Sequence, residues 1–146
     1  MSPTATYKST APAFKAALFT ALAANSDLAD VTVSYGAPIT GPREFIALSD
    51  ISGSQEFAAL GKLTKEETYT LDVYVSVVRE GNQQQECTER CFALAAELED
   101  YLRANPTVGG TVRIAQLSAP FNLEEFAGDT ARQSILTLGV EAAARI

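Results

Sequence analysis

The sequence contains no histidine and no tryptophan, and its only cysteines are Cys87 and Cys91. Without histidine, the Ser–His and Cys–His pairs of many hydrolases cannot be built, and the commonest zinc ligand is missing. The cysteines lie one turn apart in a stretch patterned as a helix, where a disulfide would strain the backbone. We therefore expect two reduced core thiols, no metal site and no cofactor.

Positive charge is also scarce, because eleven Lys and Arg stand against eighteen Asp and Glu, for a net charge of −7. This balance disfavours tight binding to a phosphate backbone, although like charge would let DNA slide past without sticking. No apolar run approaches the roughly 20 residues of a membrane span. The chain of 146 residues has the size and average composition of one domain, residues 1–146, with one core.

Two segments have the apolar period of a helix. Thr10 and Pro12 predict a helix start in which the Thr10 hydroxyl caps the free amides, and the helix covers residues 11–25. The second helix covers residues 86–104 and ends at Asn105 and Pro106. The buried stripes are Phe14, Leu18 and Leu22 in the first helix and Cys87, Cys91, Leu94, Ala95, Leu98 and Leu102 in the second.

The clearest strand is residues 67–78, where Tyr69, Leu71 and Val73 alternate with polar neighbours. Further strands are predicted at residues 31–35, 45–51, 55–60, 111–118 and 134–140. We expect a turn at residues 52–54 (SGS) and a long acidic loop over residues 120–129. The order lacks the regular alternation of a parallel α/β sheet. It predicts an α+β fold, a mainly antiparallel sheet covered by two helices.

Motifs that would carry chemistry are weak. Gly36 and Gly41 have the gap of a phosphate-binding loop, but Pro42 and Arg43 stand where that loop needs Lys and Ser or Thr. The carboxylate pairs, Glu66–Glu67 among them, are adjacent residues, which point to opposite faces of a strand. We expect no catalytic residues, and hence a protein that is not an enzyme.

Several phrases together resemble the tail terminator family of long-tailed, siphovirus-type bacteriophages. They are the alanine-rich opening helix with residues 16–18 (AAL), the strand and turn at residues 31–38 (VTVSYGAP), the strand at residues 65–75 (KEETYTLDVYV), the helix over residues 86–103 and residues 105–112 (NPTVGGTV). The likeness lies in the order of these elements and covers most of the chain.

The resemblance implies a virion structural protein at the junction of tail and head, assembled in the host cytoplasm. Its partners would be further copies of itself in a homohexameric ring, the major tail tube protein, and the head–tail connector or neck protein. The ring would stop tube polymerisation and provide the head–tail joining surface. DNA would pass through it without specific binding, and no membrane would be involved.

Two groups of residues are the candidate contact sites in this interpretation. The polar side of the strand at residues 67–78, together with its backbone edge, is the hypothesised subunit interface. For Tyr74 on that side, plain cross-strand packing is an equally supported interpretation. Polar turns supply the hypothesised axial contacts. The interface residues are Thr68, Thr70, Asp72, Tyr74 and Ser76, and the axial residues are Gln83, Gln84, Gln85, Glu124 and Glu125.

Two other functions stay open from the sequence. The first keeps the chain in the virion as a head-closure, neck or other tail-completion protein. The second is a small ligand-binding domain or enzyme whose site is built from carboxylates, tyrosine and backbone groups. A deep apolar pocket with converging Glu or Tyr side chains would favour the second function, and a flat contact surface would oppose it.

Overall fold

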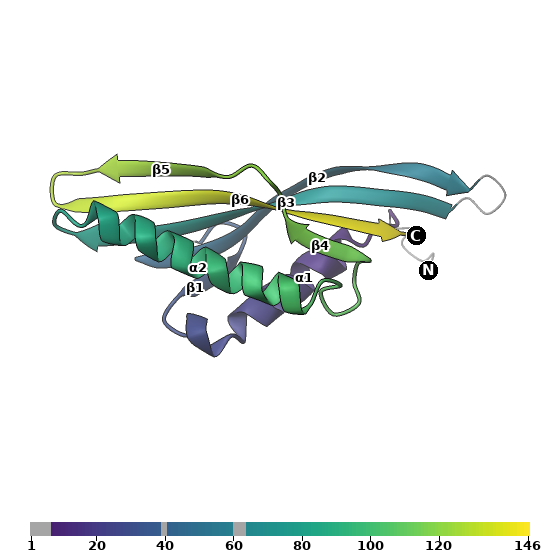
Figure 1. Cartoon of the computed structure of the whole chain (residues 1–146), viewed down its shortest axis with the longest axis horizontal. Helices are drawn as coiled ribbons and strands as arrows, with labels where there is room; N and C mark the ends of the chain where they lie inside the picture. The colour runs from purple at the N-terminus through teal and green to yellow at the C-terminus, as the bar shows by residue number, and fades with distance from the viewer. Residues whose placement is uncertain (1–6, 39–40, 60–63) are drawn as a thin grey trace, which may run out of the picture.

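The computed structural model describes residues 7–38, 41–59 and 64–146, which form one twisted sheet with both helices on one face (Figure 1). This confirms the predicted α+β fold. The helices are α1 (Ala11–Ala23) and α2 (Gln84–Ala104), with a short 3-10 turn η1 (Ser26–Leu28) between α1 and the sheet. The strands are β1 (Thr32–Tyr35), β2 (Glu44–Ala59), β3 (Thr64–Glu80), β4 (Ile114–Leu117), β5 (Asn122–Ala127) and β6 (Ala131–Arg145).

The strand order is β1-β2-β3-β6-β4, and β5 pairs with the first half of β6. Only β1 and β2 run parallel; every other pair is antiparallel, as predicted. Strands β2, β3 and β6 are long, and the β2–β3 hairpin extends beyond the helices at one end of an elongated molecule (Figure 1).

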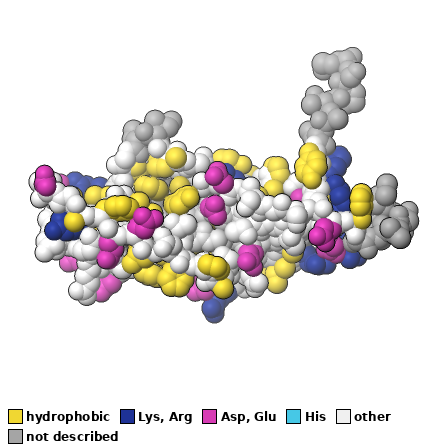
Figure 2. Space-filling view, turned by 90° about the horizontal axis from the view of Figure 1, so that it is seen from above, with side chains coloured by type: hydrophobic (Ala, Val, Ile, Leu, Met, Phe, Trp, Pro, Cys, Tyr) yellow, Lys and Arg dark blue, Asp and Glu magenta, His cyan; other side chains and the backbone are white. Residues whose placement is uncertain are grey.

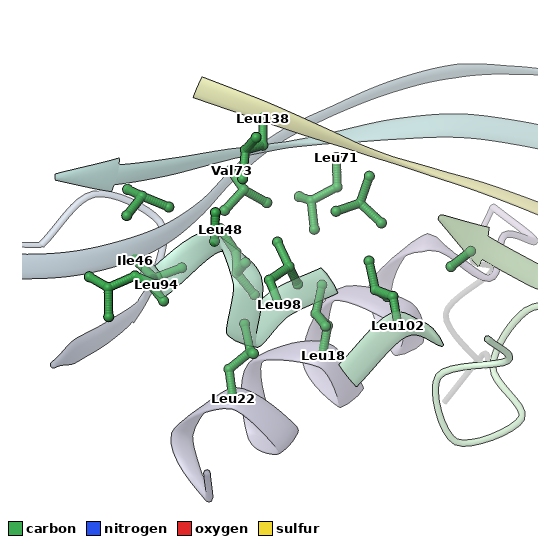
Figure 3. Packing of buried hydrophobic residues seen from close by; sticks show 14 of the residues in the cluster. Leu18, Leu22, Ile46, Leu48, Leu71, Val73, Leu94, Leu98, Leu102 and Leu138 are labelled. Carbon is green, nitrogen blue, oxygen red and sulfur yellow. The ribbon is translucent and has the colours of Figure 1, made fainter. Parts of the chain in front are cut away.

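One core fills the space between the sheet and the helices. The predicted stripe of α1, Phe14, Leu18 and Leu22, is fully buried, as is the stripe of α2 around Leu94 and Leu98. These side chains point towards Leu48 and Leu71 on the sheet (Figure 3). Burial of such leucines contributes roughly 2 kcal/mol each, so the apolar spacing of the two helices and of β3 fixes how the layers stack.

Helix α1 begins where predicted, but Thr10 does not cap it. The Thr10 side chain makes no capping bond and is turned to Glu67 on β3 instead. The hydroxyl of Ser9 accepts from the backbone N–H of Ala11, at 3.0 Å. The predicted cap was wrong because Glu67, far away in the sequence, is the stronger partner for the hydroxyl.

The predicted turn at residues 52–54 is also wrong. β2 is one strand from Glu44 to Ala59, with register shifts against β3 between Leu48 and Ile51 and between Phe57 and Ala59. Gly53 is needed because a Cβ there would lie 2.2 Å from the Thr68 carbonyl oxygen. The small residues 52–54 (SGS) therefore allow the backbones of β2 and β3 to lie close together, and they do not form a turn. The predicted strand end at Leu60 lies outside the described residues.

The expected acidic loop over residues 120–129 contains strand β5, which pairs with β6 through residues 132–137. Of the β5 side chains only that of Leu123 is half-buried and the others are exposed, so no alternation of apolar residues indicated a strand.

The predicted strand at residues 111–118 is shorter in the structure, where it forms β4. Val108, Gly109 and Gly110 have positive φ and carry the chain through turns up to Arg113. Helix α2 starts earlier than predicted, at Gln84.

Candidate functional site

The buried thiols have no chemical partner for catalysis. Cys91 donates to the backbone carbonyls of Ser134 and Val75, and burial raises the pKa of its thiol to about 11. Burial also raises the pKa of the Cys87 thiol. Both cysteines are free, and within residues 7–38, 41–59 and 64–146 no group of three His, Cys, Asp or Glu side chains could hold a metal ion.

The polar side of β3 lies on the sheet face opposite the helices, seen in Figure 2. Thr68 is exposed there, and Thr70, Asp72 and Tyr74 are half-buried, so the four predicted contact residues share one accessible face. Ser76 does not belong with them. It is fully buried and its hydroxyl accepts from Nε2 of Gln133, at 3.0 Å, which removes it from any contact surface.

The backbone of β3 is not an edge. It pairs with β2 from Thr64 to Val77 on one side and with β6 from Glu66 to Glu80 on the other. Its amides and carbonyls are thus already satisfied, and the predicted strand-edge role of residues 68–78 is wrong. Any contact that Thr68, Thr70, Asp72 and Tyr74 make must use their side chains on the open face.

Among the shallow hollows of that open face, two differ clearly in chemistry. One, of about 360 Å³, is lined by small and polar residues such as Ser52, Thr70 and Glu141. The other, of about 270 Å³, is apolar and is lined by Ala37, Pro38, Phe45, Ala47, Ser49, Tyr74 and Ile135. Apolar side chains gather over one half of this face, between acidic ones (Figure 2). No carboxylate lines the hollow beside Tyr74, so it offers an apolar contact area.

The predicted axial residues come together at one end of the molecule. Thr88 of α2 donates its hydroxyl hydrogen to Glu125 of β5, which joins the start of the helix to that strand. Gln84 is committed to the fold, because its Nε2 donates to the Gln133 carbonyl and the Ser134 hydroxyl, at 3.0 and 2.9 Å. The exposed members are Gln83, Gln85, Glu124 and Glu125.

Exposed aromatic residues lie at the sheet edges, and the sequence pattern did not reveal how they pair. Phe121, just before β5, packs edge-on against Phe92 of α2, with ring centroids 6.1 Å apart. On the opposite edge Tyr35 of β1 packs edge-on against Phe19, and the Lys15 ammonium lies 4.1 Å from the centre of the Tyr35 ring. Phe92 gave a usable signal, since it stands outside the apolar stripe of its helix.

A largely buried carboxylate on β2 joins the sheet to α2. Glu44 receives ion pairs from Arg79 of β3 and Arg90 of α2, and only 12% of its side chain is exposed. Burial by itself raises the pKa of Glu44, but the hydrogen bonds and charges of the two arginines outweigh it and hold that pKa below the ordinary value. Glu44 therefore anchors α2 to the sheet and is not placed for proton transfer.

No protein-family model matches the sequence, and no curated protein matches it. No helix among the described residues is long and apolar enough to cross a membrane.

Proposed function

We propose that the chain is a structural subunit of a bacteriophage virion, the tail terminator that forms a ring on the finished tail tube. One observation carries the proposal: a fold with a complete core keeps one sheet face and two strand edges exposed. Exposed edges attract other strands, so stable proteins cover or pair them in the assembled state. The order of sequence elements that resembles the tail terminator family supports the same assignment.

The distribution of polar groups also supports a role between neighbours in an assembly. Thr68, Thr70, Asp72 and Tyr74 lie on the open face, whereas Gln83, Gln85 and Glu124 lie at one end of the long axis. Face, strand edges and end are thus separate surfaces, as a subunit needs when it lines a channel, contacts other molecules of its own ring and meets the tube or connector along the axis. In this proposal the partners are the tube protein, the connector and further copies of the chain.

The charge of the open face fits passage of DNA without binding. Asp72 and Glu141 point to this face on neighbouring strands, while Arg145 on the same face is paired with Glu66. A surface with unpaired carboxylates repels phosphate, so DNA in a channel lined by it would slide.

The experiment is addition of the purified chain to tail tube protein encoded in the same genome while tubes polymerise. We expect the chain to bind tube ends and to stop growth, so that electron microscopy shows short tubes capped at one end. Deletion of the gene should give overlong tails. Normal-length tails beside empty heads would instead assign the chain to head closure, and tubes that grow unchanged would remove it from termination.

A further inference from the structure

The sheet has two outer strands whose outer backbone groups are unpaired within the described residues. β5 pairs only with β6, and β1 pairs only with β2. No hydrogen bond among the described residues involves the outer backbone of Asn122–Ala127 or of Thr32–Tyr35. β4 differs, because the backbone N–H of Ala115 donates to the Pro106 carbonyl, at 2.7 Å, and so blocks that part of the edge.

The two free strands lie at the same level of the sheet. By level we mean the position along the strand direction, which is traced through residues that lie opposite each other on neighbouring strands. One row runs Asn122, Thr137, Tyr74, Ala47, Ser34, and another runs Glu124, Ile135, Ser76, Phe45, Thr32. Residues in one row point to the same face, so a β5 placed beside a second copy's β1 at this level keeps apolar and polar faces in phase.

Their directions also fit. β5 runs antiparallel to β6, whereas β1 and β2 run in the same direction as β6. A second copy related by rotation about an axis along the strands therefore presents its β1 antiparallel to β5 of the first. Antiparallel pairing at this level satisfies both sets of free backbone groups without a shift in register.

We propose that copies of the chain join edge to edge, with β5 of one copy pairing with β1 of the next. The proposal rests on the proposed function, since it requires a ring of identical subunits. The contact is head-to-tail, so it generates a closed ring when the rotation closes.

Exposed aromatic residues give this contact an apolar end. In this pairing Asn122 of one copy lies opposite Ser34 of the next. Phe121 directly precedes Asn122 and Tyr35 directly follows Ser34, so their rings lie opposite each other one residue further along. Both lie on the helix side of the sheet, Phe121 against Phe92 and Tyr35 against Phe19. Buried aromatic residues dominate the affinity of most protein interfaces. The two edges are thus matched in backbone direction, in level and in side-chain chemistry.

The position of the helices decides which face points inward. Both helices cover one face, so each subunit is thicker on that side (Figure 1). A ring of such subunits closes with the helices outside and the open sheet face inside. Asp72 and Glu141 then line the channel.

The experiment is disulfide cross-linking of the full chain carrying Asn122→Cys together with Ser34→Cys. Opposed residues of paired strands have Cα atoms about 4.5–5.5 Å apart, within the range of a disulfide. Cys87 and Cys91 are buried and do not compete. Mild oxidation of concentrated protein should give a ladder of covalent oligomers on non-reducing gels that ends at the ring size, and reductant should collapse it.

The matched control is Asn122→Cys with Ser54→Cys, which keeps both cysteines at sheet edges but displaces one by roughly 20 Å along the strands. It should give no ladder, and each single variant should give dimers at most. A second pair, Glu124→Cys with Thr32→Cys, repeats the test one row away, so that misfolding of one double variant leaves the other to decide.

The outcomes separate this contact from the proposed function. A ladder from the control, or none from either level-matched pair, overturns the edge contact. If the chain nevertheless stops tube growth, termination stands and its subunits meet through another surface. If the level-matched pairs form the ladder while tubes grow unchanged, the edge contact stands and termination is wrong.

Discussion

Glu67 accepts hydrogen bonds from both the backbone N–H and the hydroxyl of Thr10, at 2.9 and 2.7 Å. The same carboxylate also accepts from the Ser9 hydroxyl and from Nε2 of Gln55. Burial alone raises the pKa of Glu67, but these hydrogen bonds outweigh it and hold the pKa below the ordinary value. One ionised side chain on β3 thus fastens the residues ahead of α1 to the sheet.

We expect Glu67→Gln to release this N-terminal segment. The amide presents one acceptor oxygen and no charge, so the charge-assisted bonds are lost and the free energy of unfolding falls by about 2 kcal/mol. Limited trypsin digestion should cleave after Lys8 faster in the variant. Glu66→Gln is the matched control, because Glu66 is a more exposed partner of Arg145 and its loss should cost less than about 1 kcal/mol. Equal effects of the two substitutions would contradict the anchoring role.

The stability of the fold should fall in acid because of Glu44 and Glu67. Both have a folded-state pKa below the ordinary value, so their contribution is fully present above about pH 4.5 and is lost as the pH falls through the folded-state pKa. Chemical denaturation at a series of pH values checks this. In the variant with Glu44→Gln and Glu67→Gln, the slope of unfolding free energy against pH below 4.5 should be shallower than in the natural chain.

The two thiols should react very slowly with thiol reagents in the native protein. Cys91 is fully buried with a pKa raised to about 11, so almost no thiolate exists at pH 8. A thiol reagent should therefore label the native chain very slowly and both cysteines promptly after denaturation. Rapid native labelling would mean that α2 opens away from the sheet under native conditions.

The elements with one buried face could be predicted from the sequence. In β3 the predicted alternation holds from Tyr69 to Val75, because one side packs on the helices and the other stays accessible. In α2 the stripe from Cys87 to Leu102 is buried, residue for residue. Local spacing decides both cases, since each side chain's environment follows from its place in the repeat.

The errors have a common cause in contacts between distant residues. Residues 52–54 look like a turn, but their small side chains permit a close approach of Thr68 and Tyr69 that no local pattern reveals. β5 has almost no buried face and is held by backbone pairing to β6, so its hydrophobic pattern is that of a loop. The candidate contact face was predicted for four of five residues, whereas Ser76 is covered by Gln133 from another strand.

We expect Gly53→Ala to destabilise the fold more than the same substitution at Gly41, in the loop before β2. The new Cβ would lie 2.2 Å from the Thr68 carbonyl oxygen and 2.4 Å from the Tyr69 Cβ, so the two long strands must separate. Such overpacking costs about 1–3 kcal/mol. Gly41→Ala is the control, since nothing lies within 4 Å of a Cβ there. Thermal unfolding of the two variants compares them directly.

Charge reversal by Glu124→Lys should impair joining of tails to heads while leaving the subunit folded. Glu124 is exposed at the end of the molecule that carries Gln83 and Gln85, and its carboxylate meets only the side-chain amide of Asn122, at 3.3 Å. Glu125 is the poorer choice, because it also accepts from Thr88 and so contributes to holding α2. The single reversal thus changes an exposed charge and removes an exposed hydrogen bond from Asn122, while the Thr88–Glu125 bond stays intact.

The readout is the fraction of heads bearing tails in electron micrographs of assembly mixtures containing the variant. Asp27→Lys, a reversal of the same sign in the exposed η1 turn away from that end, is the control and should join normally. Circular dichroism of both proteins should match that of the natural chain, since exposed charges far from the core change stability little. If Glu124→Lys joins as well as Asp27→Lys does, the end formed by α2 and β5 is not the axial contact, and the opposite end, with the β2–β3 hairpin, takes its place.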